Sequence, residues 1–138
     1  MRFSVITPNY NGDRFLEQTL QSVLSQANDT VELEYILVDG NSTDNSHTII
    51  KKYAQNLARI IIEKDTGPAN ALNKGLAAAS GDVLAWLNAD DLYYPGTLQR
   101  VQQVLEKRPD AAIWCGSSGV SFAGWQWISY RLGWRCSW

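Results

Sequence analysis

The stretch EYILVDGNSTDNS, residues 34–46, decides the class of fold that this sequence predicts. Residues 35–38 (YILV) form an unbroken apolar run, which is typical of a strand buried on both faces. Such strands occur mainly in parallel sheets that helices cover on both sides. The polar residues from Asp39 onward end the strand and predict a loop at its carboxyl end.

The same succession of strand, polar loop and helix recurs on both sides of this stretch. The predicted strands cover residues 2–7, 31–38, 59–63 and 82–87. The predicted helices cover residues 13–26, with Asp13 as the N-cap, a segment that contains Ile49, Ile50, Tyr53 and Leu57, and residues 68–79 and 95–107. This alternation indicates βαβ units, and therefore an α/β fold with a mostly parallel sheet and helices on both faces.

Composition excludes several classes of function. The chain has 138 residues, of which 45% are hydrophobic and 19% charged, as expected for a globular domain. A formal net charge of −2 gives no basic surface for nucleic acid, so we expect no nucleic-acid partner. The sequence has no long apolar run and no signal-peptide pattern, and its two cysteines, Cys115 and Cys136, suggest neither a disulfide framework nor a zinc site. We therefore expect a soluble, cytoplasmic protein.

The composition changes abruptly after Asp110. All 14 acidic residues lie at or before this position, whereas five of the six tryptophans lie from Trp114 onward. We therefore divide the chain into a domain of residues 1–112 and an atypical Trp-rich tail of residues 113–138. The tail is either an aromatic segment that packs on the sheet or a frameshifted or truncated end. Its Trp and Arg residues also leave membrane association open, although no amphipathic period indicates it.

Four polar segments follow the four predicted strands. Since ligands of open parallel sheets bind beyond the carboxyl ends of the strands, we expect these segments to form one site. They are residues 7–12 (TPNYNG), 39–44 (DGNSTD), 65–67 (DTG) and 88–91 (NADD).

Asp90 and Asp91 are the most informative residues of these segments. Adjacent carboxylates repel each other unless a cation or hydrogen-bond donors compensate, and oxygen ligands suit Mg²⁺ or Mn²⁺. The alternative is that the pair precedes a helix and faces water. No Walker loop or dinucleotide glycine pattern competes for phosphate, and His47 is expected to be a solvated residue without a role.

The motifs themselves resemble a known family. FSVITPNYNG, FLEQTLQSVLSQ, EYILVDGNSTDNS and GPANALNKGLAAASGDVLAWLNADDLYYPGTL follow one another as in the nucleotide-diphospho-sugar glycosyltransferases of the family 2 type. The resemblance runs from Phe3 to Ala112. It implies a Rossmann-like glycosyltransferase A fold, incomplete here, that binds a nucleotide sugar, often a UDP-sugar, together with a divalent cation, Mg²⁺ or Mn²⁺.

The resemblance also implies roles for individual residues. Thr7 and Pro8 would line the base, Asp39 would hydrogen-bond it, and Asp90 and Asp91 would hold the metal, with Asn88 at the first position of the family's DxD-type element. Lys74 would face the diphosphate, or else extend into solvent. The implied nucleotide-binding set is Thr7, Pro8, Tyr10, Asp39, Gly67, Lys74 and Asp90.

The implied reaction is an inverting transfer of the sugar to an acceptor hydroxyl. Such a transfer needs a general base, which in the family is a carboxylate beyond the donor half, and this sequence has no acidic residue after Asp110. The base, the sugar and the acceptor therefore stay unassigned. The alternatives are a truncated donor-binding remnant without transferase activity, an acceptor half supplied by another chain, and a nucleotidyltransferase. Nucleotidyltransferases usually have a Gly-rich loop after the first strand, whereas the corresponding segment here, TPNYNGDRF, is not Gly-rich.

Overall fold

The computed structural model describes residues 1–108, 118–122 and 125–129. The chain divides into two units, Met1–Arg100 and Val101–Trp138, and each is described by itself. The expected domain boundary at residue 112 and both cysteines lie outside the described residues.

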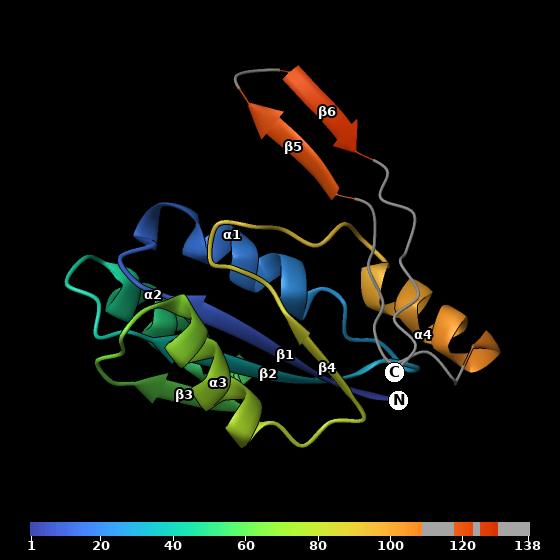
Figure 1. Cartoon of the computed structure of the whole chain (residues 1–138), viewed down its shortest axis with the longest axis horizontal. Coiled ribbons are helices and arrows are strands. Elements are labelled where there is room, and N and C mark those ends of the chain that lie inside the picture. The colour runs from blue at the N-terminus through green and yellow to red at the C-terminus, as the bar shows by residue number, and fades with distance from the viewer. Residues whose placement is uncertain (109–117, 123–124, 130–138) are drawn as a thin grey trace. The chain divides into compact units, whose positions relative to one another are not determined.

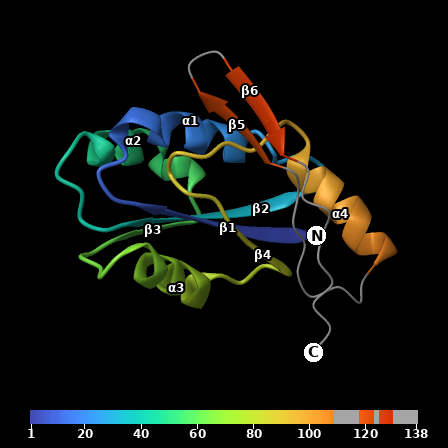
Figure 2. The ribbon, with the colours of Figure 1, turned by 45° about the horizontal axis from the view of Figure 1, so that its top comes forward.

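The first unit is built on a parallel four-stranded sheet (Figure 1). Its strands lie in the order β3-β2-β1-β4, and every neighbouring pair is parallel. Helices α1 and α2 cover one face of the sheet and α3 covers the other (Figure 2). The α/β class and the helices on both faces are therefore confirmed. The elements are β1 Arg2–Asn9, α1 Asp13–Leu24, β2 Glu32–Asp39, α2 Ser46–Tyr53, a 3₁₀ turn Ala54–Asn56, β3 Arg59–Ile62, α3 Pro68–Ala78, β4 Val83–Trp86 and α4 Thr97–Lys107, within which the two units divide.

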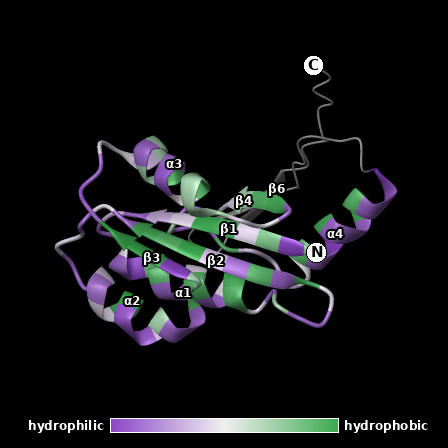
Figure 3. Ribbon diagram, turned by 90° about the horizontal axis from the view of Figure 1, so that it is seen from below, coloured by the Kyte–Doolittle hydropathy of each residue, from purple (hydrophilic) through white to green (hydrophobic). Residues whose placement is uncertain are grey.

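The core lies on both sides of the two central strands, β1 and β2. Because side chains alternate along a strand, Ile6, Ile36 and Val38 face α3 and pack with its Ala71. The opposite face carries Phe3, Val5, Tyr35 and Leu37 together with Leu16, Leu20 and Val23 of α1, all of them buried. Figure 3 shows long apolar segments in the central strands and an alternation of apolar and polar segments along the helices. The prediction that residues 35–38 are buried on both faces is confirmed.

The start of α1 differs from the sequence prediction. Gly12 is the N-cap, and Asp13 is the first residue of the helix. The Asp13 carboxylate instead accepts a hydrogen bond from the backbone N–H of Asn45 (3.2 Å), and the N–H of Asp13 donates to Asp44 Oδ2 (2.9 Å). Asp13 therefore ties the β1–α1 loop to the β2–α2 loop, which an N-cap assignment from local sequence could not reveal.

The second unit contains a pair of strands that the sequence analysis did not predict. Strands β5 (Ser118–Phe122) and β6 (Trp125–Ser129) are antiparallel, with Ser118 opposite Ser129 and Phe122 opposite Trp125. In the part of the chain that the structure describes, no helix combines the length and apolar character that a membrane span requires.

Candidate functional site

The loops at the carboxyl ends of β1 and β2 are joined by hydrogen bonds between their side chains and backbones. Asn9 and Asp39 are register partners at the last positions of the two strands, and Asn9 Nδ2 donates to Asp39 Oδ2 (2.6 Å). The N–H of Asn11 donates to Ser42 Oγ (2.8 Å), and Asn11 Oδ1 accepts the N–H of Thr43 (2.8 Å). Asn11 has a φ of 51°, a left-handed conformation that Asn tolerates better than most residues. The two loops therefore form one connected surface.

Asp39 is the centre of this network and is fully buried. Besides Asn9, its carboxylate accepts hydrogen bonds from the N–H of Ser42 (2.8 Å), from Ser42 Oγ (2.7 Å) and from His47 Nε2 (3.0 Å). Burial by itself would raise the pKa of Asp39, but these donors together hold the pKa below its usual value. Asp39 is therefore a buried carboxylate that remains ionised at neutral pH.

Two glycines show how closely the other loops approach. A Cβ atom on Gly12 would lie 2.4 Å from Asn9 Oδ1 and 3.4 Å from the Cβ of Ala89, so the β1 and β4 loops are in contact there. A Cβ atom on Gly40 would lie 2.8 Å from Asp65 Oδ2 and 3.2 Å from the ring of Tyr10. The β2, β3 and β1 loops therefore meet at Gly40. The predicted convergence of the four polar segments is confirmed.

Asp90 and Asp91 lie in the loop after β4, and both are exposed. Asn88 Nδ2 donates to Asp91 Oδ2 (3.2 Å), and the N–H of Asp91 donates to the carbonyl of Asn88 (3.1 Å). Among residues 1–108 and the two later strands, no group of three or more His, Cys, Asp and Glu side chains is placed to hold a metal. The chain therefore offers two exposed carboxylates and no closed metal cage in its described part.

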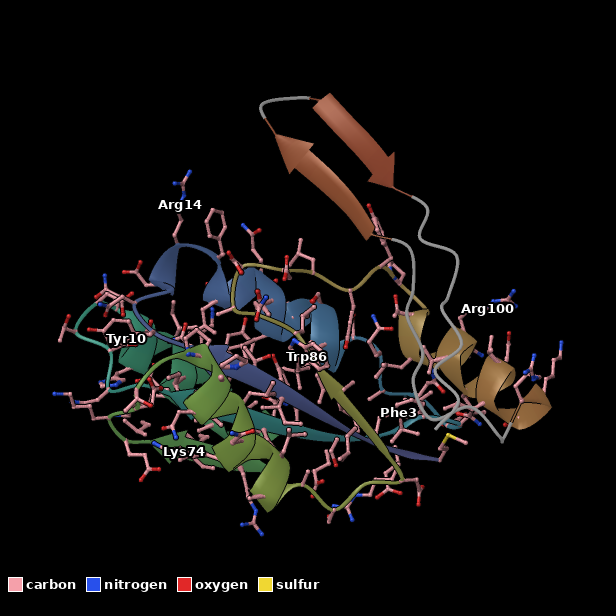
Figure 4. The ribbon with its side chains drawn as sticks, viewed as in Figure 1. Phe3, Tyr10, Arg14, Lys74, Trp86 and Arg100 are labelled. Atoms are coloured by element: carbon pink, nitrogen blue, oxygen red, sulfur yellow. The ribbon has the colours of Figure 1, made fainter. Side chains whose placement is uncertain are left out.

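The remaining predicted site residues lie in three different environments. Tyr10 is 65% exposed at the end of β1 (Figure 4), whereas Thr7 is buried and bonded to the hydroxyl of Tyr35 (2.9 Å). Lys74 of α3 pairs with Glu63 (2.8 Å) and donates to the carbonyl of Lys64 (3.1 Å). Pro8 is partly buried and follows Thr7 in β1, and Gly67 is the N-cap of α3, with its N–H bonded to Asp65 (2.8 Å).

Three residues that shape the site had no predicted role of their own, although Asn9 lies in the predicted loop segment of residues 7–12. Asn9 and His47 both bind Asp39, although His47, 44% exposed, was expected to have no role. Thr19 of α1 contacts the loop that carries Asp90 and Asp91. The signal for Asn9 lies in strand register, since a β1–β2 pairing that aligns the two strand ends puts Asn9 beside Asp39.

A parallel sheet with polar loops gathered at its carboxyl edge defines a Rossmann-like α/β fold, in which ligands generally bind at that edge. The chain belongs to glycosyl transferase family 2, because the model of that family matches residues 4–135. The match continues past Ala112, where the resemblance in sequence was expected to end.

Similar proteins include other glycosyltransferases. The chain is 39% identical over 109 residues to an uncharacterized glycosyltransferase of Nostoc. The match covers 77% of this chain and 33% of the relative. It is 36% identical over 118 residues to the putative teichuronic acid biosynthesis glycosyltransferase TuaG of Bacillus subtilis, covering 83% of this chain and 46% of TuaG. The chain therefore spans about a third to just under half of the length of these relatives.

Two solved structures share the fold. The Staphylococcus aureus TarS fragment 1–349 in complex with UDP-GlcNAc is 28% identical to this chain and matches it with a TM-score of 0.72. The match covers 79% of this chain and 32% of the fragment. The mannosyltransferase PcManGT of Pyrobaculum calidifontis in complex with GDP-Man and Mn²⁺ is 31% identical to this chain and matches it with a TM-score of 0.66. The match covers 75% of this chain and 32% of that enzyme.

Proposed function

We propose that this chain binds a nucleotide-sugar donor at the carboxyl edge of its sheet, as the donor part of a family 2 glycosyltransferase. The observation that carries the proposal is the convergence of four polar loops, which include the buried Asp39 network and the exposed Asp90 and Asp91. Similar proteins crystallised with UDP-GlcNAc and GDP-Man support a nucleotide-sugar ligand. Family membership also favours transfer of a sugar over the nucleotidyltransferase alternative.

We propose further that Asp90 and Asp91 hold a divalent cation together with the diphosphate. Mg²⁺ and Mn²⁺ prefer oxygen ligands, and Mg²⁺ is commonly held by one or two carboxylates plus water and substrate phosphates. Two exposed adjacent carboxylates fit that pattern, and the Mn²⁺ in the PcManGT complex is consistent with it. When bound, the cation would offset the negative charge of the diphosphate. Mg²⁺ and Mn²⁺ are equally compatible with these ligands.

The transfer step is proposed as an inverting displacement by an acceptor hydroxyl. It needs a base, and the sequence offers no Asp or Glu after Asp110. This composition favours a second candidate function, which is donor binding without transfer by this chain alone. The two candidates are distinguished by incubating the chain with UDP-GlcNAc and oligosaccharide acceptors and measuring UDP release. A cytoplasmic location is proposed with either function, because the donor is a charged nucleotide.

Calorimetric titration with UDP and GDP, with and without Mn²⁺, tests the proposed site in the wild-type chain and in Asp91→Ala. We expect Mn²⁺ to strengthen nucleotide binding to the wild type, and the substitution to remove most of that gain. The expected loss is at least as large as the loss of about 10-fold to 100-fold that substitutions behind metal ligands commonly cause, since Asp91 is proposed as a direct ligand of the cation.

Asp29→Ala is the matched control, because it removes an exposed carboxylate before β2, at the opposite end of the sheet. Its nucleotide affinity should equal that of the wild type. Binding that is independent of Mn²⁺ and unchanged in Asp91→Ala would exclude the proposed role of the pair.

A further inference from the structure

Three polar side chains of the α1 region, Thr19, Ser22 and Gln26, point toward the connection that joins β4 to α4. Figures 1 and 2 both show this connection running beside α1. The three residues are spaced by three and four positions, so they lie on one face of the helix and of the turn that follows it. We call this set the α1 polar row.

Thr19 makes the contacts nearest to the acidic pair. Its hydroxyl lies 2.8 Å from the carbonyl oxygen of Ala89 and 2.9 Å from that of Asp91, both nearer than the carbonyl oxygen of Phe15 in its own helix (3.4 Å). These two carbonyls flank Asp90 in the chain. Thr19 is completely buried, so the hydroxyl has no solvent to replace these acceptors. One side chain of α1 therefore fixes the backbone on both sides of Asp90.

The rest of the α1 polar row holds the following residues of the connection. Ser22 Oγ accepts the N–H of Tyr93 (3.2 Å). Gln26, which is 2% exposed, donates to the carbonyl of Tyr94 (3.1 Å) and accepts the N–H of Leu98 (3.3 Å). The α1 polar row is therefore hydrogen-bonded to the connection near its start, by Thr19, and at Tyr93 and Tyr94, and to the first turn of α4 at Leu98.

The connection has little regular structure of its own. It contains two short turns, in which the N–H of Asp91 donates to the carbonyl of Asn88 (3.1 Å) and the N–H of Thr97 donates to the carbonyl of Tyr94 (3.2 Å). The Asp90 and Asp91 side chains are exposed, so packing does not immobilise them. The position of both carboxylates thus depends on how firmly their backbone is held.

We propose that the α1 polar row is a positioning device for the cation and diphosphate site, with Thr19 as its principal member. This inference rests on the proposed function of Asp90 and Asp91. A preorganised pair of carboxylates binds a cation without first having to order its loop. Loss of the Thr19 hydroxyl therefore lowers the fraction of molecules whose loop is arranged to bind, and the apparent affinity for the cation falls by the same factor. Thr19 itself does not contact the cation.

The test compares Thr19→Val with Thr19→Ser. Valine keeps the branched shape and removes the hydroxyl, whereas serine restores it. The quantity measured is the ratio of UDP affinity with and without Mn²⁺, with GDP used if UDP does not bind. We expect Thr19→Val to lower this ratio about tenfold, as substitutions behind metal ligands commonly do, and Thr19→Ser to keep most of it.

Ser25→Ala is the control, because Ser25 is the C-cap of α1 and its Oγ donates only to the carbonyl of Ser22 in the last turn of that helix (3.0 Å). A purely structural role of Thr19 would lower the thermal stability and leave the Mn²⁺ ratio of the folded protein unchanged. That result, with Mn²⁺-dependent binding intact in the wild type, would overturn the positioning role and leave the proposed function standing.

Two further outcomes complete the test. If the wild type shows no Mn²⁺-dependent binding of UDP or GDP, the proposed function fails and the positioning role fails with it. If Thr19→Val does not fold, Ser22→Ala decides, because it removes only the acceptor for Tyr93 N–H and the hydroxyl bond to the Thr19 carbonyl. A lowered Mn²⁺ ratio in Ser22→Ala supports the inference, and an unchanged ratio overturns it.

Discussion

Strand β2 carries two buried carboxylates that differ in where they lie on the sheet. Asp39 ends the strand, and Glu34 lies near its start, on the opposite face. Glu34 accepts hydrogen bonds from Ser4, from the N–H and hydroxyl of Ser80 (both 2.7 Å) and from Arg2 (3.0 Å). Both carboxylates are thus surrounded by donors. Burial and hydrogen bonding alone therefore do not distinguish a structural carboxylate from one in a binding site.

What separates the two groups is their neighbourhood. The donors to Glu34 close the amino-terminal end of the sheet, where Ser80 follows α3 and Arg2 begins β1. The donors to Asp39 lie at the end of β1, in the β2–α2 loop and in the first turn of α2, next to loops that also bear exposed groups, among them Tyr10. In parallel sheets only the carboxyl ends of the strands open onto such loops, so Asp39 lies at the edge of the sheet proposed as the site and Glu34 lies at the opposite edge.

The largest effect is expected from Asp39→Ala. It leaves the donors on Asn9, Ser42 and His47 without their buried acceptor, so the free energy of unfolding should fall by about 3 kcal/mol. Because the same donors fix the β1 and β2 loops, nucleotide affinity should also fall, by about tenfold. Urea unfolding and titration with UDP measure the two effects. Unchanged affinity in the folded variant would place Asp39 with Glu34, outside the site.

Glu34→Gln should affect stability alone. The side chain keeps its size, but an NH₂ group, which cannot accept hydrogen bonds, replaces one of the two carboxylate oxygens. The free energy of unfolding should therefore fall by about 2 kcal/mol at pH 7. Nucleotide affinity should remain within about twofold of the wild type, since no Glu34 donor belongs to the four loops. A larger loss of affinity would mean that the two ends of the sheet are coupled.

The pH dependence of this variant follows from the pKa of Glu34. Burial opposes ionisation, but the bonds from Ser4, Ser80 and Arg2 lower the pKa from 4.5 to about 2. A lowered pKa in the folded state adds stability that is complete above pH 4.5 and is lost as the pH falls toward 2. The stability difference between wild type and Glu34→Gln should therefore shrink over this interval. A constant difference would contradict the lowered pKa.

The smallest effect is expected from His47→Ala. Its side chain is 44% exposed and supplies only one of the hydrogen bonds to Asp39, so the free energy of unfolding should fall by about 0.5–1 kcal/mol. Since Asn9 and Ser42 still hold Asp39, nucleotide affinity should change little. Urea unfolding and UDP titration of this variant show whether the Asp39 network tolerates loss of a peripheral donor. A loss as large as that of Asp39→Ala would mean that His47 is essential to it.

Much of the fold could be predicted from local sequence. The apolar run at residues 35–38 predicted a strand buried on both faces, and the four polar segments predicted the loops that meet at one edge. Helix ends were less accurate, because Gly12 takes the N-cap position and Asp13 is used between loops. The β5–β6 pair was not predicted, since the Trp-rich segment lacks the usual mixture of charged and apolar residues that reveals periodicity.

The sequence by itself determined the order of strands and helices, the position of the polar loops and the motifs of the family. Tertiary structure alone decided that Thr7 turns into the core against Tyr35, that Lys74 pairs with Glu63, and that Thr19 holds the Asp90 loop. The physical reason is the distance along the sequence over which each interaction acts. Strand propensity, turns and helical periodicity depend on neighbouring residues, whereas these contacts depend on strand register and on helix placement against the sheet, which bring distant parts of the chain together.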